Sequence, residues 1–349
     1  MPKRHPKNIR ILRAYLVWLK DARGLADSSV DRAAASIARY ETHGRGADFA
    51  NLHAEKARAF KRHLEAAKGE ASGEKLSAST VDGTLRDLKA FFRWLADQQG
   101  YRSRVTHSDA DYFTPSKRMS RSAHGGAWRE HPSPEQALHA LRSMPAATVI
   151  ERRDRAIMAS LLLTGARDGA LITLRLGNLD LRGRCVHFAG QGVETKFGKR
   201  FTTWFFPVGD DVAPMLEAWE RELRTELLFG PGDPLFPRQK VGLSVQGGFV
   251  AAGLDRKPWS GAARVAAICR QAFERAGLPP FTPHLLRKTL VDMASTRCST
   301  PEEFKAWSQN LGHEDVLTTF RSYGAVSPGR QREVILAMDG GDGQVIDLD

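Results

Sequence analysis

The sequence predicts a mainly α-helical chain with two domains, one entirely helical and one mixed α/β with a small antiparallel sheet. Two observations lead to this fold class. Apolar residues recur at three- and four-residue intervals over most of the chain, which is typical of amphipathic helices. Residues 184–208 are instead rich in β-branched and aromatic residues and contain several glycines. The 349 residues are enough for two hydrophobic cores.

The first hundred residues predict four helices. The first and fourth carry regular apolar faces, and residues 28–40 and 53–67 supply two shorter amphipathic stretches between them. Ser79 and Asp82 have the spacing of a capping pair at the start of the fourth helix. The apolar residues that define the first and fourth helices are Ile9, Leu12, Leu16, Leu19, Val81, Leu85, Leu88, Phe92 and Leu95.

Basic residues of this region fall largely off the apolar faces. Such a surface fits a DNA-binding clamp, and it fits a bundle with a solvated outer face equally well. Residues 103–129 lose the helical periodicity and are rich in Ser, His, Gly, Pro and basic residues, so they are predicted to be a linker. The candidate DNA-contacting residues of the bundle and the linker are Lys56, Lys61, Arg62, Arg86, Lys89, Arg93, Lys117, Arg118 and Arg121.

From Ser133 onward the chain is predicted to be mostly helical, with one β-rich insertion. The run 156–163 is apolar and helical, and it ends at a glycine. Residues 184–189 and 200–208 are predicted to be strands of a small antiparallel sheet. Residues 230–259 are rich in glycine and proline and are predicted to form a long loop.

The net charge of +12 favours a polyanionic partner. The excess of lysine and arginine is concentrated in the first 125 residues, whereas the last nineteen are acidic, which suits nucleic acid better than a membrane surface. The three cysteines are widely spaced and form no disulfide framework or zinc motif. We find no secretory signal, and the longest apolar run is too short to cross a bilayer. We therefore expect a cytoplasmic protein without a membrane partner, cofactor or metal.

Several residues beyond Ser133 are of types, and in positions, that can bind phosphate. Arg167 follows a glycine break at the start of a helix, where free amides favour an anion. Thr282 and Pro283 predict the start of another helix, so His284 and Arg287 share one face of its first turns. Taken alone, each of these residues is more often a surface arginine or a structural histidine.

The last part of the chain adds a histidine and a tyrosine. A capping box beginning at Thr300 predicts a helix that ends near residues 310–312, so His313 is expected to open the next helix. Tyr323 follows it, and Lys196 lies earlier, in the predicted sheet region. Arginines bind phosphate oxygens, lysine or histidine can move protons, and tyrosine can act as a nucleophile. Together these residues can attack a phosphodiester without a metal.

In this order and context the motifs resemble the tyrosine recombinase (phage integrase) family. Residues 164–167 resemble its first arginine box, and 284–287 its His-x-x-Arg box. Lys196 matches the hairpin lysine, residues 311–313 the second-histidine box, and Tyr323 the nucleophile. The resemblance implies a SAM-like core-binding domain at 8–102, a catalytic domain at 130–328 and a tail at 329–349. It implies that the domains form a C-shaped DNA clamp and that the tail docks in trans on a neighbouring protomer.

The sequence departs from the family pattern at three points. The position three residues after the first arginine, often acidic, is Ala170, with Asp168 nearby. Lys288 follows the His-x-x-Arg box, where a histidine is common. The spacing from His313 to Tyr323 is one residue longer than usual. Lys199 is also an alternative to Lys196 as the hairpin lysine.

The resemblance implies a site-specific recombinase, of a mobile element or of chromosome maintenance, that cuts and rejoins DNA through a 3′-phosphotyrosyl intermediate without metal or ATP. Its partners would be double-stranded recombination sites, on which four protomers assemble, while the free protein is a monomer or weak oligomer. Accessory DNA-bending proteins are compatible with this scheme. Two alternatives are a nicking-closing enzyme of the topoisomerase IB type and a non-catalytic DNA-binding architectural or regulatory protein.

Overall fold

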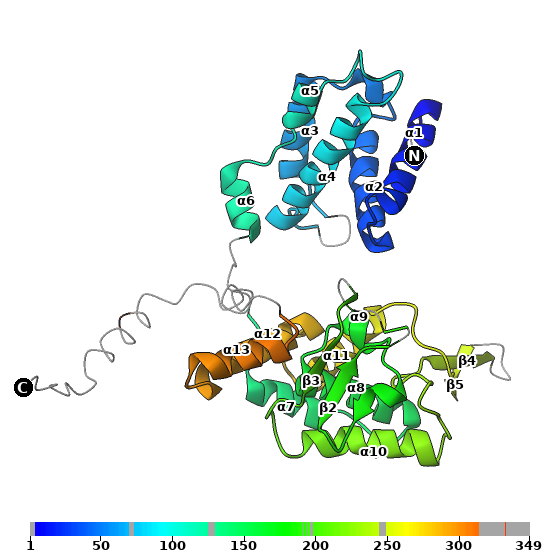
Figure 1. The fold of residues 1–349 in the computed structure, drawn as a ribbon, viewed down its shortest axis with the longest axis vertical. Coiled ribbons are helices and arrows are strands. Elements are labelled where there is room, and N and C mark those ends of the chain that lie inside the picture. Colours follow the sequence, from blue (N-terminus) through cyan, green and yellow to red (C-terminus); the bar gives the residue numbers. More distant parts are fainter. Residues whose placement is uncertain are drawn as a thin grey trace, which may run out of the picture. The chain divides into compact units, whose positions relative to one another are not determined.

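The chain folds into two compact units, Met1–Ala127 and Trp128–Asp349 (Figure 1). The computed structural model describes residues 4–69, 73–124, 130–190, 192, 193, 195, 198–243, 249–313 and 332. Each unit has its own buried hydrophobic cluster, with a third, smaller cluster inside the second unit. Among the described residues, no helix is long and apolar enough to cross a membrane.

Every regular element described in the first unit is a helix, and α4 contacts α2, α3, α5 and α6. The four helices predicted from periodicity are confirmed. Aromatic rings fill the centre of the unit: Tyr40 packs edge-on against Phe60 and Phe92, with ring centroids 5.2 and 5.1 Å apart. The helices are α1 (Pro6–Asp21), α2 (Asp27–His43), α3 (Ala54–Ala66), α4 (Ala78–Ala96), α5 (His107–Asp111) and α6 (Lys117–His124), with a short 3₁₀ turn η1 (Phe49–Asn51).

The predicted capping pair of α4 is wrong. The helix begins two residues earlier, because the side chain of Ser77 accepts a hydrogen bond from the amide of Thr80. Asp82 is instead buried in the helix. Its carboxylate pairs with Arg86 at 2.8 Å and accepts a hydrogen bond from Ser120 Oγ at 2.8 Å, which ties α6 to α4.

The predicted linker is wrong for residues 103–124. Phe113 is fully buried in the first core, where its ring stacks on Phe92 at a centroid distance of 5.4 Å. Helices α5 and α6 both pack against α4. These helices are too short for an apolar repeat to emerge from the sequence, and Phe113 lies between them, outside any periodic pattern. Residues 125–129 lie outside the described residues.

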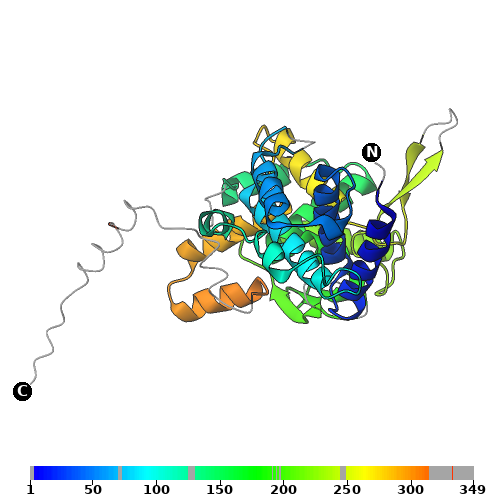
Figure 2. The ribbon, with the colours of Figure 1, turned by 90° about the horizontal axis from the view of Figure 1, so that it is seen from above.

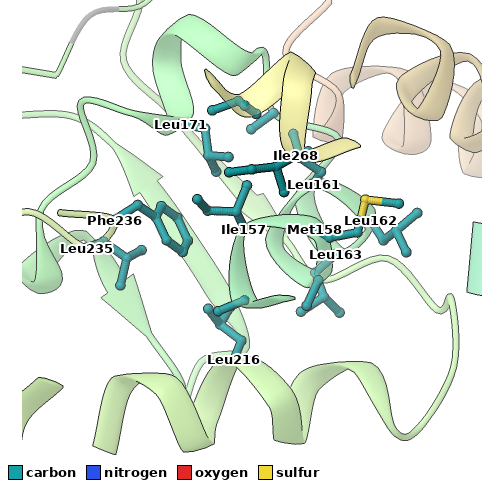
Figure 3. Packing of buried hydrophobic residues seen from close by; sticks show 14 of the residues in the cluster. Ile157, Met158, Leu161, Leu162, Leu163, Leu171, Leu216, Leu235, Phe236 and Ile268 are labelled. Carbon is teal, nitrogen blue, oxygen red and sulfur yellow. The ribbon is translucent and has the colours of Figure 1, made fainter. Parts of the chain in front are cut away.

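The second unit is built around α8, which is buried on nearly all sides. Figure 3 shows Ile157, Leu161 and their neighbours on α8 among side chains from α9, α10, α11 and the segment 235–236. The apolar run 156–163 in the second half of α8 is buried throughout, as is typical of a core helix rather than an amphipathic one. The helices are α7 (Pro134–Arg142), α8 (Val149–Thr164), α9 (Asp168–Leu171), α10 (Val212–Thr225), α11 (Ala263–Arg275), α12 (Pro283–Arg297) and α13 (Pro301–Asn310), with a 3₁₀ turn η2 (Leu176–Asn178).

The predicted small antiparallel sheet is confirmed. Its strands are β1 (Leu179–Asp180), β2 (Cys185–Phe188) and β3 (Phe201–Trp204), in the order β1-β2-β3. Cys185 stands opposite Asp180 in β1 and opposite Trp204 in β3. Val186 and Phe188 are buried in the core, so Cys185 and His187 belong to the other face of β2.

The predicted loop at 230–259 is wrong in its second half. Strands β4 (Gln239–Leu243) and β5 (Phe249–Leu254) pair there as an antiparallel hairpin with a bulge between Gln239 and Val241. The hairpin extends from the body of the unit (Figure 2). Glycine and proline are typical of loops, and they are frequent around this hairpin. Gly242 and Gly253 even lie within its strands, so the strand pattern is not visible in the sequence.

Candidate active site

Arg287 joins three segments that are distant in the sequence. It lies on α12, and its side chain is buried, with 8% of the residue exposed. One Nη donates a hydrogen bond to the carbonyl of Gly165, at the end of α8, and the other to the carbonyl of Leu311, just after α13. The guanidinium thereby satisfies two carbonyls of helix ends that have no partner within their own helices.

Thr282 directly precedes α12 and has an extended backbone, as predicted for an N-cap. Its side chain makes no capping hydrogen bond, so that part of the prediction is wrong. Pro283 is the first helical residue, where the missing amide hydrogen costs nothing. The capping box predicted at Thr300 is present, with reciprocal bonds to Glu303, and α13 ends at Asn310 as expected.

Two glycines set the turns around Arg287. Gly165 has φ of 58° and ends α8 in the left-handed conformation. A Cβ there would lie 2.7 Å from Leu311 Cδ2 and 3.0 Å from Leu290 Cδ1, so a larger residue would push apart the segments that Arg287 connects. Gly312 has φ of 70°, and a Cβ on it would lie 3.0 Å from the ring of Phe201.

Arg167 occupies the cap position of the short helix α9 and is exposed. Burial, reinforced by the charge of Arg167, lowers the pKa of Arg287 to about 9. Within the described part of the chain, neither arginine forms an ion pair with a carboxylate. Two neighbouring cations without an acidic partner create a positive potential that an anion would relieve.

His313 follows Gly312 and is half-buried. Its Nε2 lies 3.0 Å from an Nη of Arg287. Burial, and then the charges of Arg287, Arg167 and Lys199, lower its pKa to about 4. His313 is therefore neutral at pH 7. Because Arg287 can only donate, Nε2 accepts and the ring proton lies on Nδ1. A bound phosphate would counter the same positive charges and raise this pKa.

Lys199 and Asn310 connect the small sheet to this site. Lys199 precedes β3, and its carbonyl accepts a hydrogen bond from Thr195 Oγ1 at 2.6 Å. Asn310, at the end of α13, receives a bond from the Trp204 amide at 2.8 Å and returns one to the Trp204 carbonyl at 2.9 Å. Nothing in the sequence around Asn310 indicates this role, and sequence reasoning missed it.

The structure thus gathers Arg167, Arg287, His313 and Lys199. His284 lies in the first turn of α12, exposed and three residues before Arg287. Lys196 and Tyr323 lie outside the described residues. So does the predicted helix after His313.

Four of the nine candidate DNA-contacting residues have intramolecular partners in the first unit. Arg86 pairs with Asp82, Lys89 and Arg93 pair with Asp111, and Lys61 donates to the carbonyl of Thr114. Lys61, Lys89 and Arg93 thereby hold α3 and α4 to residues 111–114, whereas the Arg86 pair lies within α4. The other five candidates are exposed: Lys56, Arg62, Lys117, Arg118 and Arg121.

A model of the phage integrase family matches residues 130–330, which contain every segment of this site. The chain belongs to the phage integrase family. The XerC tyrosine recombinase of Stutzerimonas stutzeri is 26% identical over 314 residues, 88% of this chain and 89% of that one. The XerD tyrosine recombinase of Pseudomonas putida is 30% identical over 171 residues, and the match spans about half of each chain (49%).

Many solved structures share the fold, including those of a lambda integrase and a transposon integrase. A lambda integrase dimer bound to a COC′ core site is 16% identical, with a TM-score of 0.59 over 92% of this chain and 81% of that chain. The Tn1549 transposon integrase in complex with a circular intermediate DNA is 15% identical, with a TM-score of 0.57 over 94% and 99%. The predicted family, the mainly helical fold with a small antiparallel sheet and the enzyme class are therefore confirmed: this is a tyrosine recombinase, of the family that cleaves and rejoins DNA.

Proposed function

We propose that this chain recombines specific DNA sites through a 3′-phosphotyrosyl intermediate. The observation that carries the proposal is the pair Arg167 and Arg287, which neighbour each other with no acidic partner among the described residues. A scissile phosphate supplies the missing negative charge, and Arg287 is already oriented by two backbone carbonyls. Preorganised charge of this kind is among the largest contributions to catalysis.

The reaction is a transesterification. Tyr323 Oη attacks the phosphorus, a bond from oxygen to phosphorus forms, and the bond to the departing 5′ oxygen breaks. Arg167 and Arg287 hold the non-bridging oxygens while negative charge builds on them. His313, with its proton on Nδ1 in the free protein, donates to the same group after reorienting away from Arg287. The phosphodiester energy is kept in the covalent link, so rejoining needs no ATP.

Two proton transfers complete the step. The tyrosine hydroxyl has a pKa near 10 in water, so it must lose its proton in the site. His284 is our candidate base because it lies on the first turn of α12 and is exposed. The departing 5′ oxygen must gain a proton, and Lys196 or Lys199 supplies it.

The two lysines can be separated by substitution. We expect Lys196→Ala to slow cleavage of an ordinary 5′ oxygen by about a hundredfold or more, because general acid catalysis typically contributes that much. A substrate with a 5′-bridging phosphorothiolate needs no proton on its sulfur leaving group, and it should be cleaved by this variant at close to the wild-type rate. Lys199→Ala is the matched control. Rescue of Lys199→Ala instead would assign the acid to Lys199.

We propose that four protomers assemble on two paired sites, since recombination requires two cleavages in each duplex. The acidic tail, residues 329–349, carries apolar residues on both sides of a glycine-rich stretch and is proposed to dock on a neighbouring protomer. The domains are proposed at 8–102 and 130–328, with residues 103–124 added to the first. The five exposed basic residues of that domain would contact the DNA backbone.

Deletion of residues 331–349 tests the docking proposal. We expect the truncated protein to bind a single half-site as the wild type does and to lose assembly on paired sites. Sedimentation velocity of the protein with DNA distinguishes these states by mass. Tetramers of the truncated protein with unchanged stability would contradict docking by the tail.

Covalent trapping tests the function as a whole. The protein is incubated in EDTA with a library of randomised nicked duplexes, and adducts that resist SDS are captured and sequenced. A nick beside the cut site lets a short fragment diffuse away, so the covalent link persists. Adducts that share a sequence support a site-specific enzyme, and strand exchange between two such duplexes separates recombination from simple nicking and closing. Tight duplex binding without adducts would contradict the proposal.

Because the substrate is DNA and Cys185, Cys269 and Cys298 are free thiols, we place the activity in the cytoplasm.

A further inference from the structure

Asp180, Cys185 and His187 gather on the face of the small sheet opposite Val186 and Phe188, where Cys185 is buried and His187 is exposed. Their ligand atoms all lie within 4.8 Å of one another. Asp180 stands opposite Cys185 in the β1–β2 pairing, and His187 follows two positions along β2 on the same face. None of the three takes part in the proposed recombination mechanism. We propose that they bind one divalent metal ion of the zinc class.

The spacing of the cysteine and histidine ligand atoms fits a tetrahedral ion. Cys185 Sγ lies 3.7 Å from His187 Nε2. Two ligand atoms at about 2.3 Å and about 2.1 Å from a tetrahedral zinc ion are themselves about 3.6 Å apart. The two side chains therefore reach this separation with almost no rearrangement. A carboxylate oxygen of Asp180 is the third ligand, and water completes the four.

The neighbouring groups orient these ligands. His187 Nδ1 lies 3.0 Å from Thr202 Oγ1 on β3, a partner that leaves Nε2 directed at Cys185. The amide of Gly183 donates to Asp180 Oδ1 at 2.9 Å, which leaves Oδ2 for the metal. A Cβ on Gly183 would lie 2.5 Å from that Oδ2, so the glycine also leaves the space the carboxylate needs.

The ligand types select the metal. A thiolate and an imidazole suit zinc, cobalt and related ions, and they disfavour magnesium and calcium, which take oxygen ligands. Binding converts the Cys185 thiol to a thiolate and releases its proton to solvent. Sequence inspection expected no metal because the three cysteines are widely spaced and match no zinc motif. Asp180 comes beside Cys185 only through the pairing of β1 with β2. That expectation of no metal is the one this proposal replaces.

An ion at this location would restrict the movement of β1 relative to β2. It would join Asp180 of β1 to Cys185 at the first residue of β2, and β2 pairs with β3 to form the hairpin whose connecting segment, 189–200, contains Lys196 and Lys199. A filled site would therefore fix the base of the hairpin that carries the proposed general acid. The site itself is independent of the recombination proposal and can be tested without DNA.

Cobalt(II) provides the probe, because thiolate ligation gives a charge-transfer band in the near ultraviolet and tetrahedral geometry gives intense visible bands. We expect tag-free, reduced, metal-stripped protein to show both bands with one equivalent of cobalt, and zinc to displace them. Cys185→Ser should lose the charge-transfer band. Cys298→Ser is the matched control, since Cys298 is partly exposed and lies outside the cluster, and it should keep the band.

Surface variants make the test decisive even if Cys185→Ser fails to fold. His187 is exposed and Asp180 is partly exposed, so His187→Gln and Asp180→Asn should fold normally. Each should weaken cobalt binding by at least about tenfold and abolish the rise in melting temperature that zinc gives the wild type. Bands that persist in Cys185→Ser, or binding that both surface variants leave unchanged, would indicate adventitious metal only and overturn the proposal. Absence of binding to the wild type would overturn it as well.

Discussion

Tyr323→Phe is expected to abolish covalent capture of DNA while leaving DNA binding intact. The substitution removes only the hydroxyl that forms the bond to phosphorus, so no protein–DNA adduct can accumulate. Loss of a nucleophile lowers catalysis by at least about a thousandfold in enzymes that act through a covalent intermediate. The measurement is the rate of SDS-resistant adduct formation on a nicked duplex, together with the binding isotherm on the same DNA.

Tyr112→Phe is the matched control for this experiment, because the Tyr112 side chain is exposed and lies in the first unit. It should form adducts at the wild-type rate. Adducts of undiminished yield in Tyr323→Phe would show that another residue is the nucleophile. A parallel loss of duplex binding would show instead that the hydroxyl is needed for DNA affinity.

Arg287→Ala is expected to lose both catalysis and stability. The substitution removes a donor to phosphate oxygens, and removal of one such electrostatic group typically costs about a hundredfold to a thousandfold in rate. It also leaves the carbonyls of Gly165 and Leu311 without their buried partner. An unsatisfied buried group costs about 1–3 kcal/mol, so the free energy of unfolding should fall clearly.

Comparison with Arg167→Ala separates the catalytic role of Arg287 from its structural role. Arg167 is exposed and makes no such bonds among the described residues, so its loss should reduce adduct formation by a similar factor. The positive charge of Arg167 repels that of Arg287. Its removal should therefore leave the free energy of unfolding constant or raise it slightly. Urea unfolding monitored by circular dichroism measures this difference. Equal stability of Arg287→Ala and the wild type would contradict the structural role.

Much of this architecture can be predicted from the sequence. Long amphipathic helices such as α1 and α4 have several turns over which the apolar repeat is visible. The phosphate-binding motifs are also short and local, so Arg167 and His284 were found beside recognisable helix starts. The family match at residues 130–330 agrees with this interpretation of the motifs.

The errors share a physical cause. Residues 103–124 form helices of five and eight residues, too short to display a periodic face, and Phe113 is buried by neighbours distant in the sequence. The β4–β5 hairpin contains glycines that are typical of loops. Contacts such as Arg287 with two carbonyls depend on how three segments meet in space, which a single sequence does not reveal.

The double role of Arg287 restricts how a descendant of this protein can lose its activity. A DNA-binding protein without catalysis could arise readily by replacement of Arg167, which is exposed. The same loss through Arg287 would also release the ends of α8 and α13 from α12, and much of the folded protein would be lost with the activity. Selection for folding alone would therefore preserve this arginine in copies of the gene that no longer recombine DNA.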